Sequence, residues 1–242
     1  MGEFLTNKRA LITGSSKGIG FAIAEALVSA GADAVLCARN AKPLQDAIAG
    51  LKRNAPGRHV IGYPADVSNS ADVAGLFQFV DKELGGLDIL INNAGFGLFR
   101  VAAELSVEEW DSLIATNLSA AFYCSREALE RFAKSGGGWI VNIGSLAGKN
   151  PFSGGAGYNA AKFGLTGFSE AMMMDHRHDN VKVSCIMPGS VDTGFGGGGA
   201  SKKSDWKIAP EDIAEIVLDV LKMPARTLIS RVEVRPSRPR KN

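Results

Sequence analysis

The stretch "RALITGSSKGIG", residues 9–20, decides the fold. It begins with a short apolar run and continues into a turn with the glycine spacing G-x-x-x-G-x-G. After this turn, apolar side chains recur at helical spacing, at Ile19, Ile23, Ala26 and Leu27. A glycine-rich turn between a strand and a helix lets a pyrophosphate approach the backbone at the positive helix N-terminus. The stretch therefore predicts a nucleotide-binding strand–turn–helix unit, and a tight turn without a ligand is the alternative.

The same alternation of strand and helix patterns continues along the chain. Apolar runs, typical of strands buried on both faces of a parallel sheet, cover residues 9–13, 33–38, 59–64, 87–92, 139–143 and 181–187, with a weaker run at 230–234. Amphipathic helical patterns follow Gly18 and cover about 43–53, 70–84, 106–133, 157–178 and 210–222. We expect a single α/β domain, residues 1–242, with helices on both faces of a doubly wound parallel sheet of about seven strands.

The composition narrows the classes of function. The 242 residues are 45% hydrophobic and 21% charged, with a formal net charge of +2. A nearly neutral chain without a basic stripe argues against a nucleic-acid partner, and no apolar run approaches the ~18–20 residues of a membrane span. The first residues lack the apolar core of a signal peptide. We expect a cytoplasmic protein without a nucleic-acid or membrane partner.

The cysteines and histidines show no metal-site spacing. Cys37, Cys124 and Cys185 lie far apart in apolar contexts, which predicts three buried, reduced thiols. The three histidines form no ligand pattern either. We therefore expect no metal site.

Two cationic residues lie where a dinucleotide would place its adenosine ribose. A site that prefers NAD has an acidic residue about 20 residues beyond the glycines, where it binds the ribose hydroxyls. Here Arg39 stands at the corresponding position, 19 residues beyond Gly20 (39 − 20 = 19). Arginine binds a 2′-phosphate that an acid would repel, and Lys17 in the glycine-rich turn adds a second positive charge. The pair predicts NADP(H), and surface charge at loop tips is the alternative.

The stretch "GYNAAKFG", residues 157–164, puts Tyr158 and Lys162 on one helix face. A phenol with a pKa near 10 exchanges protons poorly at pH 7, and a nearby ammonium group lowers that pKa. Ser145, at the end of the fifth predicted strand, can donate a hydrogen bond to a substrate oxygen. Taken alone, the pair of Tyr158 and Lys162 favours two ordinary residues on a helix, and their use together in acid–base chemistry is the alternative that other motifs must support.

In order along the chain, these motifs resemble the short-chain dehydrogenase/reductase family. The resemblance extends from Leu11 to about Leu221. Ser145 precedes Tyr158 by the usual spacing of that family, 158 − 145 = 13 residues. The other matching motifs are "TGSSKGIG" (13–20), "NNAG" (92–95), Asn117, Lys162 and "PGSVDT" (188–193).

The resemblance implies a Rossmann-like fold and reversible, NADPH-dependent reduction of a ketone or aldehyde to an alcohol. Tyr158 would be the general acid in reduction and the general base in the reverse reaction, and Asn117 would hold a water that relays protons to Lys162. The implied catalytic residues are Asn117, Ser145, Tyr158 and Lys162. The implied cofactor-binding residues are Gly14, Ser16, Lys17, Gly18, Ile19, Gly20, Arg39, Asp66, Val67, Asn93, Ala94, Gly95, Tyr158, Lys162, Pro188, Gly189, Val191 and Thr193.

The substrate is less constrained. The resemblance favours a 3-oxoacyl thioester on acyl-carrier protein or CoA. The stretch 194–207 is expected to be a lid over a pocket, with a plain flexible loop as the alternative. Its Lys202, Lys203 and Lys207 could attract an acidic carrier, and a solvated loop is the alternative. However, the chain ends in "SRVEVRPSRPRKN" (230–242), where such reductases commonly have Asp-Gly-Gly. Small carbonyls, sugar alcohols and hydroxy acids are therefore alternative substrates. An NADPH-binding sensor without turnover is an alternative of another class.

The resemblance also implies an assembly. Members of the family commonly dimerise through two long helices, which here correspond to about 106–133 and 157–178. We expect a homodimer or homotetramer. The basic tail, residues 235–242, is expected to be a solvated terminus.

Overall fold

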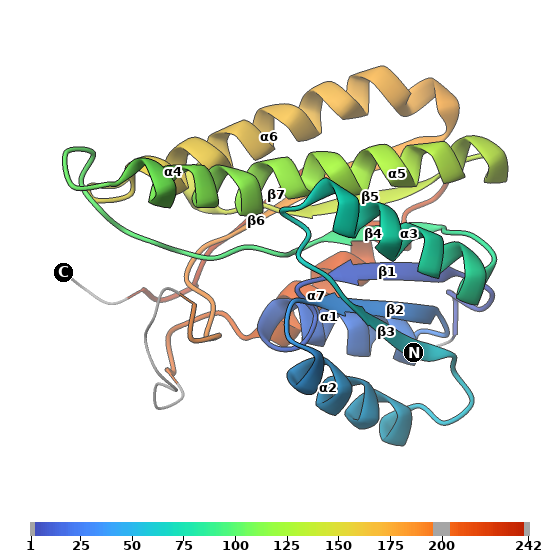
Figure 1. Ribbon diagram of the computed structural model, residues 1–242. Helices are drawn as coiled ribbons and strands as arrows, with labels where there is room; N and C mark the ends of the chain where they lie inside the picture. Colours follow the sequence, from blue (N-terminus) through green and yellow to red (C-terminus); the bar gives the residue numbers. More distant parts are fainter. Residues whose placement is uncertain (1–2, 196–203, 240–242) are drawn as a thin grey trace.

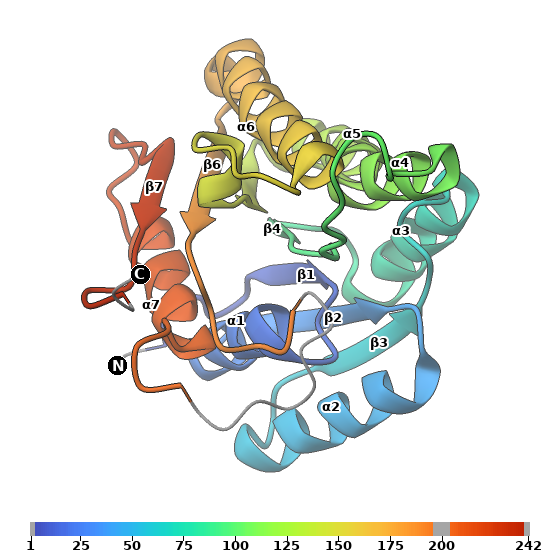
Figure 2. The same ribbon diagram turned by 90° about the vertical axis from the view of Figure 1, so that its left-hand side faces the viewer.

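The computed structural model describes residues 3–195 and 204–239, and its strands form one parallel sheet (Figures 1 and 2). The order of the seven strands in this part of the chain is β3-β2-β1-β4-β5-β6-β7. The strands are β1 (Arg9–Thr13), β2 (Asp33–Ala38), β3 (Val60–Pro64), β4 (Ile89–Asn92), β5 (Gly138–Ile143), β6 (Val181–Pro188) and β7 (Arg231–Val234). The predicted doubly wound α/β fold is confirmed, including its weak seventh strand.

Helices cover both faces of this sheet, as Figure 2 shows. One face packs against α1 (Gly18–Ser29), α2 (Ala41–Asn54) and α7 (Pro210–Leu221). The other face packs against α3 (Ser70–Leu84), α5 (Ala120–Ser135) and α6 (Ala156–His176), and α4 (Val107–Ile114) precedes α5. Short helical turns are η1 (Ala115–Ser119), η2 (Leu146–Gly148) and η3 (Arg177–Asp179).

The alternation of side chains along each strand builds two cores. Ala10 and Ile12 of β1 join the core under α1, α2 and α7, whereas Leu11 joins the core under α3, α5 and α6. In β2, Leu36 joins the first of these cores and Val35 joins the second. Successive strand residues point to opposite faces, so a strand covered on both faces must be apolar at nearly every position. This is why these runs in the sequence are continuous rather than alternating.

The helix predicted over 106–133 differs from the structure. It begins with the expected capping box between Ser106 and Glu109, but a turn of π-helix, η1, separates α4 from α5. Inside that turn, the side-chain amide of Asn117 donates to the carbonyl of Leu113, 3.1 Å away. This carbonyl would accept the backbone N–H of residue 117 in a regular α-helix. The side-chain bond competes with the helical ladder, and apolar periodicity alone does not reveal it.

The sheet brings the predicted site residues to one edge. The strand order reverses between β1 and β4, and parallel strands end together at their carboxyl termini. Open α/β sheets bind ligands at such a switch point. The segments that follow β1, β4, β5 and β6, which carry most of the candidate residues, all begin at this edge.

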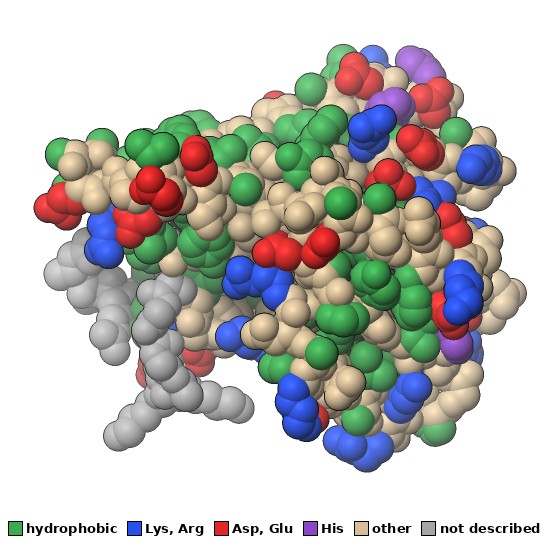
Figure 3. All heavy atoms as spheres, in the orientation of Figure 1, with side chains coloured by type: hydrophobic (Ala, Val, Ile, Leu, Met, Phe, Trp, Pro, Cys, Tyr) green, Lys and Arg blue, Asp and Glu red, His purple; other side chains and the backbone are tan. Residues whose placement is uncertain are grey.

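Figure 3 shows how the kinds of side chain are distributed over one face of the molecule. Lysine, arginine, aspartate and glutamate side chains are interspersed there, with hydrophobic side chains over the upper helices. None of the helices in the described ranges is both long enough and apolar enough to cross a bilayer.

Candidate active site

The glycine-rich turn after β1 is shaped by close backbone approaches. Gly14 and Gly18 have φ angles of +64° and +60°, which favour glycine. A Cβ on Gly14 would lie 2.8 Å from the Cα of Ala94, so a larger residue would push β1 and β4 apart. The third glycine, Gly20, packs against the carbonyl of Gly14 and the side chain of Asn93. The turn therefore leaves its backbone open in front of the N-terminus of α1.

Polar side chains fix this turn to its neighbours. The hydroxyl of Thr13 accepts hydrogen bonds from the backbone N–H groups of Asn93 (3.0 Å) and Ala94 (3.1 Å). In return, the side-chain amide of Asn93 donates to the carbonyls of Thr13 and Gly14, both at 3.0 Å. Asn93 and Ala94, predicted to bind the cofactor, thus hold β1 and β4 in register. Ser15, which the sequence did not single out, ties the turn to β2 by accepting the N–H of Cys37 at 3.1 Å.

The ribose end of the predicted site lies at the tips of β2 and β3. Arg39 and Lys17 are exposed and form no ion pair with any described residue. After β3, one carboxylate oxygen of Asp66 accepts from the N–H and the hydroxyl of Ser68, and Val67 is buried. The arrangement gives two cations and a fixed carboxylate beside the glycine-rich turn.

The segment after β6 closes the other side of the turn. Gly189 donates its N–H to the carbonyl of Val234 at 2.8 Å, which holds Pro188 and Gly189 against β7. Val191 forms an isolated parallel β-bridge with Ile208. The side chain of Thr193 lies close to Gly18, since a Cβ on Gly18 would be 3.3 Å from it. The segment thus runs back across the N-terminus of α1. Of the other predicted contacts, Ser16 is half-buried in the turn and Ile19 packs against the core.

Tyr158 and Ser145 meet at the carboxyl edge of β5. Ser145 follows this strand, and its hydroxyl accepts the N–H of Ala147 at 3.1 Å, which orients the side chain at the start of η2. Tyr158 lies in the first turn of α6, is 7% exposed, and hydrogen-bonds to the Ser145 side chain. Residues 13 positions apart in sequence are thereby in direct contact.

Lys162 lies one turn further along α6 and is 5% exposed. Its Nζ atom donates to the carbonyl of Ile143 at 3.0 Å and lies 5.9 Å from the centre of the Tyr158 ring. Burial lowers the pKa of Lys162 to about 8 from an ordinary value of 10.5, and the Cys185 thiolate would act in the opposite direction. The side chain is therefore largely protonated at pH 7, with a pKa much closer to neutrality than that of an exposed lysine.

The expectation that Lys162 lowers the pKa of Tyr158 is not met in the cofactor-free protein. Burial of the phenol raises the pKa of Tyr158 above its ordinary value, and the hydrogen bond from Ser145 offsets part of this rise. The physical reason is desolvation, which disfavours the charged form of both side chains. The short sequence spacing could not show how completely the two groups are buried.

Asn117 reaches the site from the π-helical turn. Its side-chain N–H donates to the carbonyls of Phe96 and Leu113, both at 3.1 Å, and its Oδ1 atom is buried without a hydrogen-bond partner among the described residues. A Cβ on Gly95 would lie 2.7 Å from this Oδ1 atom, which explains the glycine. The side chain thus anchors the segment after β4 and leaves one acceptor available to a ligand or water.

A buried polar network behind the site was not found from the sequence. The amide of Asn92 donates to Ser125 (3.0 Å) and to Asn142 (2.8 Å), and Asn142 donates to Ser169 at 2.8 Å. These residues join β4 and β5 to α5 and α6, the helix that carries Tyr158 and Lys162. Isolated polar residues in the sequence did not predict this network, because its members lie up to 77 residues apart (169 − 92).

The residues present fit a dinucleotide cofactor. The glycines leave the backbone open at a helix N-terminus. A Cβ at Gly14 or Gly18 would instead crowd Ala94 or Thr193. The lid predicted over 194–207 is described only in part, because residues 196–203, including Lys202 and Lys203, lie outside the described ranges. The end of that stretch is held to the site, since Asp192 accepts the N–H of Ser204 at 3.1 Å.

Comparison with known proteins decides the family. The family model for short-chain dehydrogenases matches residues 8–203, which is most of the chain and includes the glycine-rich turn, Ser145, Tyr158 and Lys162. The chain belongs to the short-chain dehydrogenase family. D-beta-hydroxybutyrate dehydrogenase of Rhizobium meliloti (strain 1021) is 38% identical to this dehydrogenase over 190 residues, 76% of this chain and 71% of that protein.

Two solved structures share the whole fold with this short-chain dehydrogenase. An alcohol dehydrogenase from the archaeon Thermococcus sibiricus, complexed with 5-hydroxy-NADP, superposes with a TM-score of 0.90 at 30% identity, covering 97% of this chain and 99% of that one. A metagenomic short-chain oxidoreductase in complex with NADP has a TM-score of 0.85 at 35% identity, with the same coverage. The chain is thus an oxidoreductase of this family.

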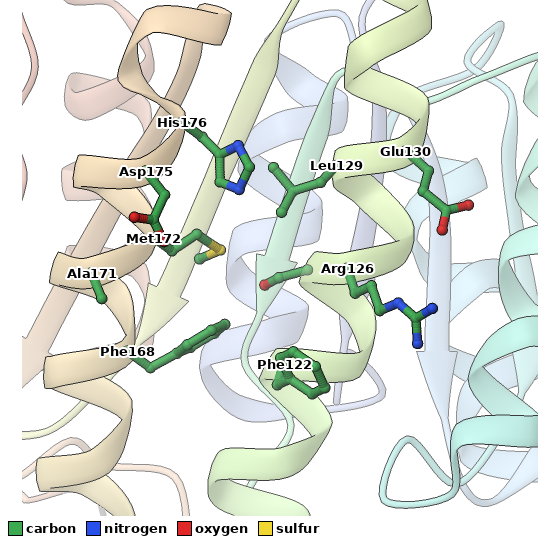
Figure 4. A pocket seen from close by; sticks show the side chains of 10 residues that line it. Phe122, Arg126, Leu129, Glu130, Phe168, Ala171, Met172, Asp175 and His176 are labelled. Carbon is green, nitrogen blue, oxygen red and sulfur yellow. The ribbon is translucent and has the colours of Figure 1, made fainter.

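A groove between two helices of this dehydrogenase lies apart from the candidate catalytic residues. It has a volume of about 370 Å³ and lies between α5 and α6 (Figure 4). Phe122, Leu129 and Phe168 form its apolar walls, and Arg126, Asp175 and His176 lie at its rim. Ser145, Tyr158 and Lys162 do not line this groove.

Proposed function

We propose that this short-chain dehydrogenase reversibly reduces a ketone or aldehyde to an alcohol with NADPH. The observation that carries the proposal is the contact of the Tyr158 hydroxyl with Ser145, above a buried Lys162, at the ligand-binding edge of the sheet. A phenol, a hydroxyl and an ammonium group arranged in this way suit proton transfer to a carbonyl oxygen.

Each residue has a part in this reaction. When bound, the reduced nicotinamide supplies a hydride to the carbonyl carbon. Tyr158 transfers its proton to the carbonyl oxygen, where negative charge develops, and Ser145 donates a hydrogen bond to the same oxygen. The reverse reaction uses the Tyr158 phenolate as the base. The high pKa of the buried phenol means that the proton is present on Tyr158 at pH 7 when reduction begins.

Lys162 stabilises the phenolate that reduction leaves behind. With a pKa of about 8, the side chain is largely protonated at pH 7, and its charge favours loss of the Tyr158 proton. The burial that lowers the pKa of Lys162 also strengthens its field, because few waters screen it. Asn117 is proposed to hold a water that returns a proton to Lys162 from solvent, and its unpaired Oδ1 atom supports this role.

NADP(H) is the proposed cofactor. Arg39 and Lys17 are cations exposed beside the glycine-rich turn, where the 2′-phosphate of NADP would lie. Two proteins of the same fold and family are known in complex with NADP or 5-hydroxy-NADP. An adenine would face Asp66 and Val67, and the nicotinamide would face the segment from Pro188 to Thr193.

The class of carbonyl is a further part of the proposal. A 3-oxoacyl thioester, favoured by the resemblance, and a small carbonyl, sugar alcohol or hydroxy acid all suit this chemistry. Lys207, expected to attract an acidic carrier, lies 3.9 Å from the Asp192 carboxylate, which weakens its attraction for an acidic carrier. We propose a cytoplasmic location as well, because three buried thiols without a disulfide suit a reducing compartment.

A homodimer through α5 and α6 completes the proposal. The groove between these helices exposes Phe122 (46%) and is lined by Phe168, whose ring lies 6.0 Å from that of Phe122. Charged residues of both signs at its rim, Arg126, Glu130 and Asp175, suit pairing with a symmetric copy. On the same helix, Met172 is buried within the subunit and Met174 is 52% exposed.

NADPH oxidation over a panel of carbonyls tests the proposed function. The panel contains acetoacetyl-CoA, sugars, α-dicarbonyls and aryl ketones, and we expect turnover with at least one class. Tight NADPH binding without turnover of any carbonyl would instead favour the sensor without catalysis.

A further inference from the structure

Three phenylalanines from separate segments surround the catalytic tyrosine. Phe99 follows β4, Phe152 precedes α6 and Phe195 follows β6. The ring of Phe99 meets that of Tyr158 edge to face, with centres 5.6 Å apart and planes at 89°. The ring centre of Phe195 lies 5.8 Å from that of Tyr158. Phe152 contacts Phe99 instead, with ring centres 5.5 Å apart. We call Phe99, Phe152 and Phe195 the aromatic cluster.

The aromatic cluster is open to solvent although it adjoins a buried site. Phe99 and Phe152 are each 44% exposed and Phe195 is 48% exposed, whereas Tyr158 is 7% exposed. The approach of the segments is close, because a Cβ on Gly97 would lie 2.7 Å from Phe195 and 3.0 Å from Phe99. Half-exposed phenylalanines gathered beside a catalytic group offer apolar area that a ligand can cover.

The cationic side chains on the same segments are already paired. Arg100 and Lys149 are the cationic residues in the ranges 93–106, 144–155 and 188–195. Arg100 lies 3.5 Å from Glu109, and Lys149 lies 2.5 Å from Glu233. An anionic substrate would have to compete with these carboxylates, whereas an uncharged one leaves both pairs intact.

We propose that the substrate is an uncharged ketone or aldehyde with an aromatic ring next to its carbonyl, held by the aromatic cluster. The inference rests on the proposed carbonyl reduction at Tyr158. The carbonyl oxygen meets Tyr158 and Ser145 while the ring packs on Phe99 and Phe195, in the edge-to-face or offset arrangements that aromatic pairs prefer. A 3-oxoacyl thioester, with its charged carrier, and a hydroxy-acid carboxylate fit this surface less well.

The test compares three substrates with NADPH. Ethyl benzoylformate and ethyl pyruvate are both neutral, and the group next to the ketone is phenyl in the first and methyl in the second. Ethyl benzoylformate and benzoylformate share the phenyl group and differ mainly in charge. We expect kcat/KM for ethyl benzoylformate to exceed that for each of the other two by at least about 10-fold, the scale on which an apolar pocket discriminates. Acetoacetyl-CoA is included as the carrier-like competitor and should be slower than ethyl benzoylformate.

Variants of the aromatic cluster locate the effect. Phe99→Ala and Phe195→Ala should each lower the phenyl-to-methyl ratio of kcat/KM by about 10-fold, mainly through KM, and Phe99→Leu should restore part of it. Phe4→Ala, at an exposed phenylalanine that contacts Lys222, is the matched control and should leave the ratio unchanged. Thermal unfolding checks that each half-exposed site tolerates its substitution.

The outcomes separate this inference from the proposed function. A ratio near one, a ratio that the cluster variants do not change, or a preference for benzoylformate or acetoacetyl-CoA would overturn the aromatic substrate while leaving carbonyl reduction intact. Absence of NADPH oxidation with every carbonyl would overturn the proposed function and, with it, this inference.

Discussion

At Lys162, burial and catalysis oppose each other. The ammonium group must be charged to stabilise the Tyr158 phenolate, yet its surroundings lower its pKa to about 8. A hydrogen bond to the Ile143 carbonyl compensates only part of the lost hydration. We therefore expect the buried Lys162 side chain to lower the stability of the folded protein without its ligand, a common cost of function.

The pH dependence of stability follows from this pKa. Below about pH 8, Lys162 is charged in both the folded and the unfolded chain, and the folded state bears the full cost of burial. Between about pH 8 and the unfolded pKa near 10.4, only the unfolded chain keeps the proton, so this residue's contribution to stability rises with pH. We expect cofactor-free Lys162→Met to be more stable than wild type at pH 7, by about 1–3 kcal/mol, and the difference to shrink towards pH 10.

Urea unfolding of both proteins at pH 7, 8, 9 and 10 measures this difference. Lys134→Met, at an exposed position near the end of α5, is the control and should change stability little at any pH. A stability difference for Lys162→Met that is the same from pH 7 to pH 10 would contradict the assigned burial cost.

The proposed role of Arg39 in cofactor preference is tested at the residue scale. Arg39→Asp replaces a phosphate partner with an acid that accepts ribose hydroxyls, so the NADPH-to-NADH ratio of kcat/KM should fall by at least about 10-fold. Steady-state kinetics with both cofactors measures the ratio. Arg226→Asp makes the same charge change on an exposed residue in the loop before β7 and should leave the ratio as it is. An unchanged ratio in Arg39→Asp would remove the phosphate role.

At the scale of elements, the fit of η2 against α6 keeps Ser145 beside Tyr158. Gly148 in η2 has no room for a side chain, because a Cβ would lie 2.6 Å from both the carbonyl of Lys162 and the hydroxyl of Thr166. The helix α6 also carries Tyr158 and Lys162, the two proposed catalytic side chains of this element. A change in the distance between these two elements should therefore affect stability and turnover together.

Gly148→Ala tests this packing. We expect a loss of about 1–3 kcal/mol in the free energy of unfolding, the usual cost of overpacking, together with a fall in kcat as Ser145 and Tyr158 separate. Gly50→Ala in α2 is the matched control, because its Cβ would meet only ordinary contacts at 3.9 Å or more, and it should stabilise by up to about 1 kcal/mol. Wild-type urea midpoint and kcat in Gly148→Ala would refute the argument.

The elements also show what the sequence could and could not predict. Strands buried on both faces leave continuous apolar runs, so β1, β2 and the weak β7 were predicted almost to the residue. The π-helical turn at Asn117 was missed because its cause is a single side-chain hydrogen bond to Leu113. For the site, the resemblance to the family singled out Tyr158 and Ser145, whereas the depth of burial that controls the pKa values of Tyr158 and Lys162 depends on the whole fold.

At the scale of the whole molecule, the proposed dimer predicts a change in mass. Phe168→Asp places a charge in the groove between α5 and α6, where a second copy would bury it at high cost. We expect this variant to be monomeric by light scattering coupled to size-exclusion chromatography, while wild type is a dimer or tetramer. Val107→Asp, at an exposed first-turn position of α4, should keep the wild-type mass. A monomeric wild type, or an assembled Phe168→Asp, would contradict this interface.

The central claim is that the proton needed for reduction passes through the hydroxyl of Tyr158. Tyr158→Phe removes one oxygen from a side chain whose ring keeps its contacts with Phe99 and Phe195. The most direct test measures NADPH binding and kcat for this variant, with Tyr123→Phe on α5 as the control. We predict NADPH affinity within about two-fold of wild type and a kcat lower by about 10²–10⁴-fold, the usual contribution of a general acid. Turnover at the wild-type rate in Tyr158→Phe would contradict the account.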